Sequence, residues 1–235
     1  MTKILFVCHG NICRSPAAEL LLREMAKQAG LLSSFEISSA ATSSEEIGNP
    51  IYPPMCVLLE ERGLDCSRHR ARRVRRSDYD AYDLIIGMDE ENLRDMRRIY
   101  GGDPDGKISL MMDWAGFPGR AVSDPWYTRD FERAYGDIRL ACEGLLYQLS
   151  GTVVVDFSLC WDIPTLYGEI RNKLQWQDWY GENLDALYDV LTGLPHRGER
   201  FLLIMPPENS PQDARLYARR IRQVFEEAGV LSRPE

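Results

Sequence analysis

The sequence lacks the features that mark several large classes of protein. None of its apolar runs approaches the roughly 20 residues that a membrane-spanning helix needs. We expect no signal peptide, and no internal repeat or long low-complexity segment is visible. The net charge is −8 over 235 residues and is shared evenly by the two halves, so nothing favours direct binding of nucleic acid. We therefore expect a globular protein that contacts neither a membrane nor nucleic acid directly.

The chain has only three histidines, and it has six cysteines. Four of the cysteines are scattered in apolar or helical settings with no spacing typical of a metal site: Cys56, Cys66, Cys142 and Cys160. We therefore expect no metal and no other cofactor. The other two thiols, Cys8 and Cys13, lie in one short segment together with an arginine, and this segment concentrates the chemistry of the chain.

Residues 8–16 read Cys-His-Gly-Asn-Ile-Cys-Arg-Ser-Pro, between the apolar run 4–7 and the helical pattern 17–22. The pattern predicts a strand, a tight loop and a helix. Inward-facing loop amides and a helix N-terminus together form a site for a tetrahedral oxyanion. A neighbouring arginine and a helix N-terminus favour the ionised thiol, so Cys8 is the predicted nucleophile toward phosphorus. Arg14 is expected to clamp the phosphoryl oxygens with its planar fork.

The other residues of this loop have supporting roles. Gly10 and Asn11 tolerate the positive φ that such a loop needs. Ser15 can donate to the Cys8 sulfur. If the loop brings Cys13 within about 6 Å of Cys8, a reversible disulfide could protect the thiolate from overoxidation. The predicted substrate-binding residues of the loop are His9, Gly10, Asn11, Ile12, Cys13 and Ser15.

This loop resembles that of the low-molecular-weight protein tyrosine phosphatases, whose pattern is Cys-x-Gly-Asn-x-Cys-Arg-Ser-Pro. Further similarities follow at residues 39–43, 47–50, 69–72, 88–93 and 124–127. The resemblance covers the first 150 residues. It implies a doubly wound α/β fold with a parallel four-stranded sheet, and hydrolysis of phosphotyrosine in proteins through a phosphocysteine intermediate.

Asp124 lies in the segment that resembles the general-acid loop of that family. A departing phenoxide needs a proton, which a carboxylic acid on a loop can deliver, and the resulting carboxylate can then activate water. Trp126 and Tyr127 follow directly. Their rings either form a wall of the substrate pocket or pack on the core.

Three further residues are expected around the loop rather than at the reacting atoms. The resemblance implies that His69 hydrogen-bonds Asn11 and holds its strained backbone, whereas the residues alone indicate a surface histidine in an arginine-rich loop. Asp89 either orients Arg14 or caps the helix that follows it, and we favour the cap with a supporting role. Ser43 belongs to the second segment that resembles the family.

Two relatives of this fold class are less compatible with the sequence. Thioredoxin-coupled arsenate reductases need a closely spaced downstream pair of cysteines, whereas Cys56 and Cys66 are ten residues apart and upstream of the expected place. Protein arginine phosphatases resemble this loop with a threonine where Ile12 stands, and isoleucine favours phosphotyrosine. Because a reactive thiol must stay reduced and no signal peptide is seen, we expect a cytoplasmic protein.

Two charged features bear on the choice of substrate. Glu45 stands where some members of the family carry an aromatic residue at the pocket mouth, so acidic phosphopeptides are expected to be disfavoured. The run from Arg68 to Arg76 contains six arginines. It is either a solvated loop or a surface that attracts phosphoproteins or an acidic partner.

A second domain is expected to begin near residue 151, so that the two domains span residues 1–150 and 151–235. Strands are predicted at 153–157 and 201–205, with helices at 163–174, about 183–191 and about 212–228. This alternation is typical of a small parallel sheet covered by helices.

Residues 179–193 resemble the recognition loop and helix of barstar, an intracellular ribonuclease inhibitor whose pattern is Tyr-Tyr-Gly-x-Asn-Leu-Asp-Ala-Leu-x-Asp. The resemblance implies a barstar-like α/β domain that binds or inhibits a ribonuclease-like partner, although residues 230–232 leave little room for the last strand of that family. Alternatively, this domain is an autoinhibitory or targeting module that docks on the Arg68 to Arg76 run. The predicted partner-binding residues are Trp179, Tyr180, Asn183, Asp185, Tyr188, Asp189, Thr192 and Gly193.

Overall fold

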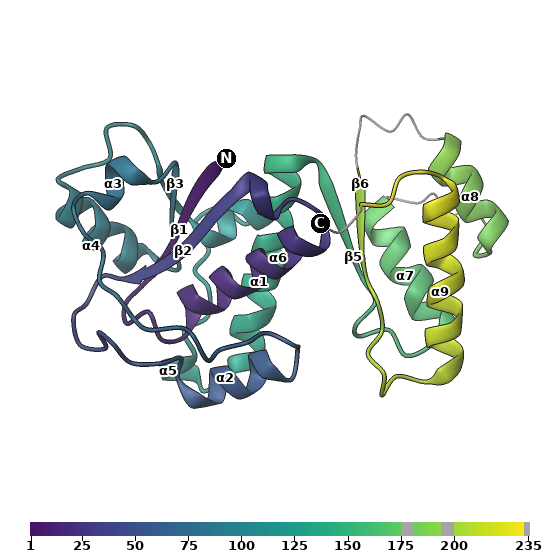
Figure 1. The fold of residues 1–235 in the computed structure, drawn as a ribbon, viewed down its shortest axis with the longest axis horizontal. Coiled ribbons are helices and arrows are strands. Elements are labelled where there is room, and N and C mark those ends of the chain that lie inside the picture. The colour runs from purple at the N-terminus through teal and green to yellow at the C-terminus, as the bar shows by residue number, and fades with distance from the viewer. Residues whose placement is uncertain (175–180, 194–199, 233–235) are drawn as a thin grey trace. The chain divides into compact units, whose positions relative to one another are not determined.

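The computed structural model describes residues 1–174, 181–193 and 200–232 (Figure 1). The chain divides into two compact units, one of residues Met1–Leu145 and one that begins at Leu146. Each unit has its own sheet and is described by itself. Among the helices of the described residues, none combines the length and apolar character needed to cross a bilayer.

The first unit is built on a four-stranded parallel sheet in the order β2-β1-β3-β4. Its strands are β1 (Thr2–Cys8), β2 (Phe35–Ala41), β3 (Leu84–Gly87) and β4 (Ile108–Leu110). Residues 4–8 of the central strand β1 are buried, as expected for a parallel strand covered on both faces. The predicted doubly wound α/β fold of this unit is confirmed.

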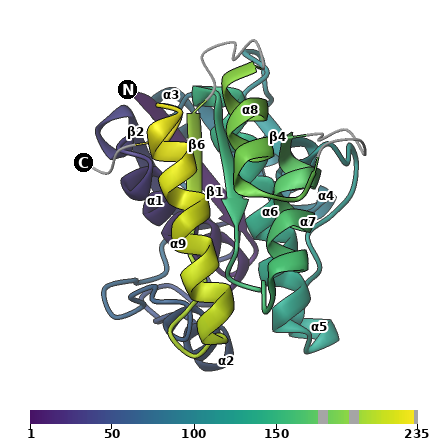
Figure 2. The same cartoon turned by 90° about the vertical axis from the view of Figure 1, so that its right-hand side faces the viewer.

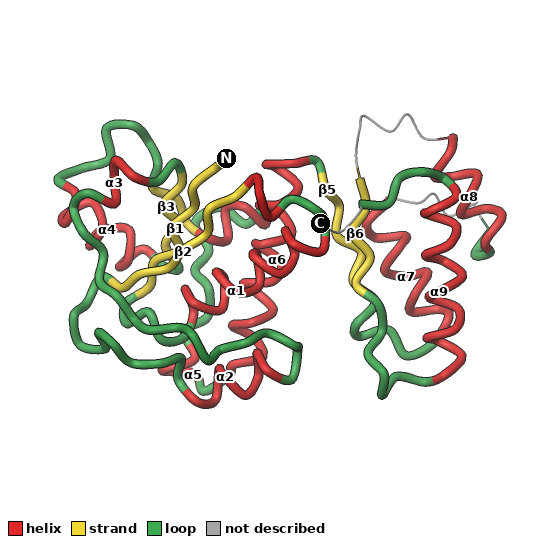
Figure 3. Tube along the Cα trace, in the orientation of Figure 1, coloured by secondary structure: helices red, strands yellow, loops and turns green. Residues whose placement is uncertain are grey.

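Helices cover both faces of this sheet. Figure 1 shows α1 (Arg14–Gln28) and α6 (Phe131–Ser150) on one side, and α3 (Asp78–Ala81) and α4 (Glu90–Tyr100) on the other. The short helices α2 (Pro53–Glu60) and α5 (Pro125–Thr128) and two 3₁₀ turns (Leu32–Ser34, Met111–Ala115) complete the described helical elements of this unit. In Figure 3, the connections through residues 42–52 and 61–77 appear mainly as loops.

The strand order places the loop after β1 at a switch point. The chain leaves β1 through α1 to β2 on one side, and later returns to β3 on the other side of β1. In open parallel sheets a crevice forms at the carboxyl ends of the strands where the order reverses. Cys8 ends β1, and Asp89 follows the end of β3. Both residues therefore lie at the edge where a ligand site is expected.

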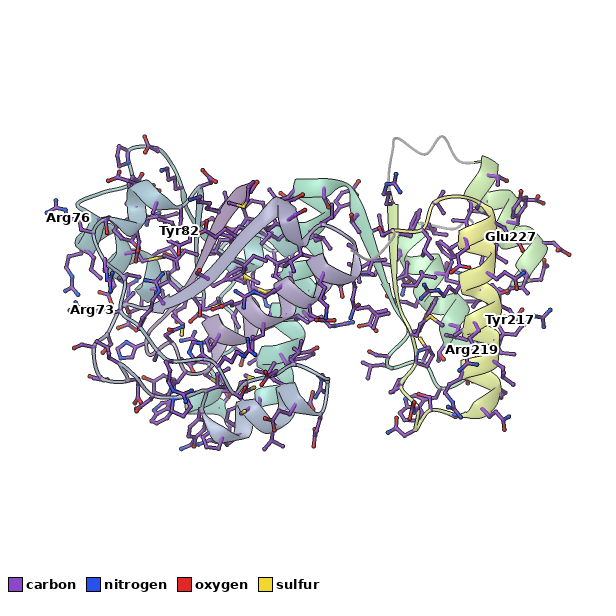
Figure 4. All side chains as sticks on the ribbon, in the orientation of Figure 1. Arg73, Arg76, Tyr82, Tyr217, Arg219 and Glu227 are labelled. Atoms are coloured by element: carbon purple, nitrogen blue, oxygen red, sulfur yellow. The ribbon has the colours of Figure 1, made fainter. Side chains whose placement is uncertain are left out.

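The arginine run is only partly a solvated loop. Arg73 forms an isolated parallel bridge with Ala41 of β2, and its Nε donates to Thr42 O at 3.2 Å. Arg72 pairs with Asp78 at 3.0 Å. Arg73 and Arg76 nevertheless lie at the surface of this unit (Figure 4). The run therefore extends the pairing of β2 while it exposes several of its charges.

The second unit contains a two-stranded parallel sheet of β5 (Thr152–Asp156) and β6 (Arg200–Ile204). Helices α7 (Ile163–Leu174), α8 (Leu184–Gly193) and α9 (Gln212–Glu227) lie on the same face of that sheet (Figure 2). Their apolar sides bury a core that includes Phe157, Tyr167, Phe201 and Phe225. The predicted smaller α/β unit with a parallel sheet is confirmed.

The last described residues of this unit add a third, very short pairing. Leu231 forms a parallel bridge with Phe201, and Ser232 N donates to Phe201 O at 2.8 Å. The expectation that this segment has little room for a last strand agrees with a single bridge. Within the described residues, the third strand of this sheet is thus reduced to a single bridge.

Candidate active site

The loop between β1 and α1 holds the predicted nucleophile and clamp close together. Cys8 and Arg14 are both buried, each with 3% of its surface exposed. The amide of Asn11 donates to Cys8 Sγ at 3.2 Å. In the described part of the chain, the amides of Gly10, Ile12 and Cys13 donate to no protein acceptor. Such unpaired donors ahead of a helix are suited to an oxyanion.

Asn11 is the structural centre of this loop. It is fully buried, with φ of 56° in the left-handed region, which asparagine tolerates better than most residues. Its Nδ2 donates to Ser15 Oγ at 3.0 Å and to Ser39 Oγ at 2.8 Å, and its Oδ1 accepts from Arg72 N at 3.0 Å. Its side chain therefore ties the loop to α1, to β2 and to the arginine run.

His69 lies where the resemblance places it. Its Nε2 donates to Asn11 O at 2.7 Å, from a position 58 residues later in the chain. Burial lowers the pKa of His69 below its ordinary value of 6.5, and the bond to Asn11 opposes this shift. A neutral imidazole with its proton on Nε2 is consistent with this contact.

Gly10 has a different role from the one predicted. Its φ is not among the positive values of the chain, so it is not needed for a left-handed turn. A Cβ at this position would lie 3.2 Å from Glu46 Cγ, tighter than most side-chain contacts, so the Glu46 side chain would have to shift slightly. Glycine at this position therefore leaves room for Glu46, and the prediction of a positive φ at Gly10 was wrong.

Ser15 and Cys8 form a direct contact, with 3.1 Å between Ser15 Oγ and Cys8 Sγ. The hydroxyl also lies 3.4 Å from Ala40 O. Because it has one proton and accepts another from Asn11, the hydroxyl can donate to only one of these neighbours. An ionised sulfur is the stronger acceptor, so this arrangement suits a thiolate at Cys8.

Two aspartates hold the two ends of the Arg14 guanidinium. Asp89 Oδ2 lies 2.7 Å from Arg14 Nη1, and Asp124 Oδ2 lies 2.6 Å from Arg14 Nη2. The other oxygen of each carboxylate caps a helix: Asp89 Oδ1 accepts from Asn92 N at 2.8 Å, and Asp124 Oδ1 accepts from Trp126 N at 2.9 Å. The two interpretations of Asp89, as a cap and as an orienting residue, therefore both apply.

The charges around Arg14 raise the pKa of its guanidinium. Burial alone would lower the pKa of Arg14, but the charges of Cys8, Asp124 and Asp89 raise it above its ordinary value. The pKa of the Cys13 thiol is also raised, chiefly by burial and further by Cys8 and Asp124. Cys13 is therefore held as a neutral thiol beside a permanently charged guanidinium.

A cavity of about 370 Å³ opens above this loop. Trp126 and Tyr127 line it and are 52% and 83% exposed, so neither ring is packed into the core. The Trp126 ring contacts Tyr52 edge-on, with 5.7 Å between the ring centroids. The residues that line the cavity are Cys8, His9, Gly10, Ile12, Cys13, Arg14, Glu45, Glu46, Asp89, Glu91, Asn92, Asp124, Trp126 and Tyr127.

The mouth of the cavity is acidic. Glu45, Glu46 and Glu91 line the cavity and are exposed or half-buried, whereas the Arg14 charge is buried. His9 Nε2 lies 3.4 Å from Glu45 Oε2. The floor of the cavity is therefore positively charged and suited to an anion, whereas its rim is negatively charged and attracts cations.

Ser39 and Glu19 were missed from the sequence. Ser39 Oγ accepts from Asn11 and donates to Glu19 Oε2 at 2.6 Å. Ser43 lies further from this network: its N donates to His9 O at 3.0 Å, and its Oγ accepts from Glu45 N. The available signal for Ser39 was its place at the start of residues 39–43, the segment that resembles the family.

Three of the predicted partner-binding residues of the second unit share one surface. Asp185, Tyr188 and Asp189 are exposed on α8 and line a groove of about 510 Å³, together with Arg220 and Gln223 of α9. Figure 4 shows Glu227, another residue of this groove, further along α9.

The other members of that set have local roles or lie elsewhere. Asn183 Oδ1 accepts from Ala186 N at 2.9 Å, which caps α8. Thr192 Oγ1 donates to Tyr188 O at 2.8 Å, and Gly193 is the last residue of α8. Trp179 and Tyr180 lie outside the described residues.

Comparison with known proteins gives two matches to family models. Residues 3–154 match the model described as low molecular weight phosphotyrosine protein phosphatase, and residues 151–232 match the model described as barstar (barnase inhibitor). The chain is 37% identical over 147 residues to the low molecular weight protein-tyrosine-phosphatase YfkJ of Bacillus subtilis, which covers 62% of this chain and 94% of YfkJ.

Solved structures agree with this likeness for the first unit. The crystal structure of YfkJ matches with a TM-score of 0.61 and 37% identity, covering 63% of this chain and 94% of that chain. The structure of the Drosophila arginine phosphatase DARP matches with a TM-score of 0.58 and 28% identity, covering 63% and 98%. The fold alone therefore does not separate the two kinds of phosphatase.

Proposed function

The chain belongs to the low molecular weight phosphotyrosine protein phosphatase family, and on that premise we propose that its first unit hydrolyses phosphotyrosine in proteins through a phosphocysteine intermediate. The observation that carries the proposal is the arrangement of Cys8, Arg14 and Asp124 around one cavity, with Asp124 paired to Arg14 at 2.6 Å.

In the first step the Cys8 thiolate attacks phosphorus, and a sulfur–phosphorus bond forms as the bond to the phenolic oxygen breaks. The unpaired loop amides and Arg14 neutralise the charge of the phosphoryl oxygens. Asp124 in its acid form gives its proton to the departing phenoxide. Because the entering phosphoryl group competes with Asp124 for Arg14, its arrival frees the carboxyl group to face the leaving oxygen.

In the second step the Asp124 carboxylate takes a proton from water, and the resulting hydroxide attacks phosphorus. The sulfur–phosphorus bond breaks, inorganic phosphate leaves, and Cys8 returns to the thiolate. Ser15, 3.1 Å from the sulfur, stabilises it as a leaving group. Asn11 and His69 keep the loop in the shape that both steps need.

The test is hydrolysis of p-nitrophenyl phosphate by the full chain. We expect Cys8→Ser to abolish turnover and Asp124→Ala to accumulate a phosphocysteine that can be trapped and located on Cys8. Cys160→Ser, which removes a thiol from the second unit, should turn over like the parent. Activity that survives Cys8→Ser would refute the proposed nucleophile.

For the substrate, we propose phosphotyrosine flanked by basic residues. Ile12 lines the cavity without a hydroxyl, and three glutamates surround the mouth. Like charges at this rim repel acidic peptides. The test compares matched phosphotyrosyl peptides with lysine or glutamate neighbours, and a free phosphoarginine substrate. Faster hydrolysis of the phosphoarginine substrate would overturn this assignment.

For the barstar-like unit, which we assign to residues 151–235 after a phosphatase domain of residues 1–150, we propose binding of a ribonuclease-like protein with a basic cleft. Asp185 and Asp189 lie on the exposed side of α8 beside Tyr188. Close charge pairs across the barnase–barstar interface couple by about 1.5–7 kcal/mol, so loss of one aspartate should weaken such a complex at least about tenfold.

The test is titration of the full chain with a basic ribonuclease of the barnase type. Asp189→Ala should weaken binding, whereas Asp213→Ala, which removes an exposed acid from the first turn of α9, should not. Equal affinity of both variants would count against the α8 surface.

Regulation of the first unit by the second is less favoured by the contacts. Arg72 and Arg73 of the proposed docking run are already engaged by Asp78 and Thr42 of their own unit. Comparing the kcat/KM of residues 1–150 with that of the full chain separates the alternatives, because autoinhibition predicts a large rise on truncation.

A further inference from the structure

Three side chains of types that can bind metals lie together at the end of α2, although their spacing in the sequence predicted no metal site. Cys56 and Glu60 are one turn apart on α2 and therefore share a face. The turn that follows the helix brings Cys66 back to them. The two thiol sulfurs and a carboxylate oxygen all lie within 4.8 Å of one another.

The distance between Cys56 and Glu60 fits two ligands of a tetrahedrally coordinated ion. Zinc binds thiolate sulfur at about 2.3 Å and carboxylate oxygen at about 2.0–2.2 Å, which places sulfur and oxygen about 3.5 Å apart at the tetrahedral angle. Cys56 Sγ and Glu60 Oε1 are 3.6 Å apart. We propose that Cys56, Glu60 and Cys66 form a binding site for a divalent zinc-like cation.

The surroundings allow a cation to enter and be held. Cys66 is buried, Cys56 is half-buried and Glu60 is exposed, so the ion has access from the Glu60 side. Three protein ligands leave the fourth position to water, as in open zinc sites. On binding, the two thiol protons pass to solvent while two sulfur–metal bonds form, and no oxidant or reductant is required.

The site would stabilise a turn that supports the catalytic loop. Cys66 Sγ makes long contacts to two backbone oxygens, 3.7 Å to Cys56 O and 3.9 Å to Leu64 O. Cys66 O accepts from His69 N at 3.3 Å, and His69 in turn holds Asn11. A metal that crosslinks α2 to Cys66 therefore restrains the segment that carries His69, and it should raise the thermal stability of the chain.

The experiment uses the full chain with Cys8→Ser as the parent, so that the active-site thiolate cannot bind the ion. Co²⁺ is added under a phosphine reductant, and the visible bands of tetrahedral cobalt and the sulfur-to-cobalt ultraviolet band are followed, with Zn²⁺ as competitor. We expect one equivalent to bind and the unfolding midpoint to rise.

Matched variants decide the assignment. Adding Cys56→Ser should weaken Co²⁺ binding about 100-fold or more and remove the sulfur band, and Glu60→Gln should weaken it about tenfold. Cys160→Ser should bind like the parent. Cys56 is half-buried, so its serine variant should keep the metal-free unfolding midpoint. A parent without tetrahedral bands, or bands that persist in Cys56→Ser, would overturn the proposal.

Discussion

Replacing Asp124 by asparagine separates two opposing contributions of this residue. Asparagine keeps an oxygen that can cap α5, as Asp124 Oδ1 now does through Trp126 N. It cannot donate a proton to the leaving group, and it carries no charge to pair with Arg14. The variant is therefore expected to lose turnover while its affinity for the phosphate anion rises.

The two magnitudes follow from the site. A positioned general acid contributes about 10²–10⁴ in rate, so kcat should fall by that factor. The Arg14–Asp124 pair joins a buried side chain to one that is 27% exposed, and a partly exposed ion pair contributes about 1 kcal/mol. Because inorganic phosphate must displace this pair, its inhibition constant in Asp124→Asn should fall about fivefold.

The assay compares p-nitrophenyl phosphate with phenyl phosphate at low salt. The loss of kcat should be larger for phenyl phosphate, because its less acidic phenol depends more on the donated proton. Glu91→Gln is the matched control, since it removes an exposed charge from the same cavity without a contact to Arg14. An unchanged kcat, or weaker binding of phosphate, would refute the roles given to Asp124.

Three further predictions concern stability. A Cβ at Gly144 would lie 1.9 Å from Trp114 O, so Gly144→Ala should lower the free energy of unfolding by about 1–3 kcal/mol. In Gly136→Ala, on the same helix, the new Cβ meets nothing within 4 Å, so this variant should raise the free energy of unfolding by about 0.5–1 kcal/mol. Urea unfolding measures both changes. The pKa of His69 is below 6.5 in the folded chain, so the unfolded chain binds the proton first and stability is lost as the pH falls below 6.5. His69→Gln should therefore flatten the curve of stability against pH in this range. An unchanged curve would exclude His69 as the source of that loss. Asn11→Ala should be less stable than Asn11→Gly by about 1 kcal/mol, because alanine is strained at a φ of 56°, and equal unfolding midpoints would argue against that strain.

Much of the active-site loop could be predicted because its contacts are local. The apolar run before Cys8 and the helical pattern after Pro16 predict strand and helix without reference to the rest of the chain. Within seven residues the backbone can bring Ser15 to Cys8 in few ways, and the observed distance is 3.1 Å. The α8 pattern was likewise predicted to within a residue or two at either end.

The sequence by itself therefore determined the chemistry of the loop, the identity of its nucleophile and arginine as candidates, and the order of strands and helices in the second unit. Only the tertiary structure decided which distant groups meet there. Ser39 reaches Asn11 through the β1–β2 register, and Asp89 and Asp124 converge on Arg14 from the ends of separate elements. Cys56 and Cys66 meet through a turn. These contacts depend on how parallel strands and crossover helices pack, and a local pattern carries no information about that packing.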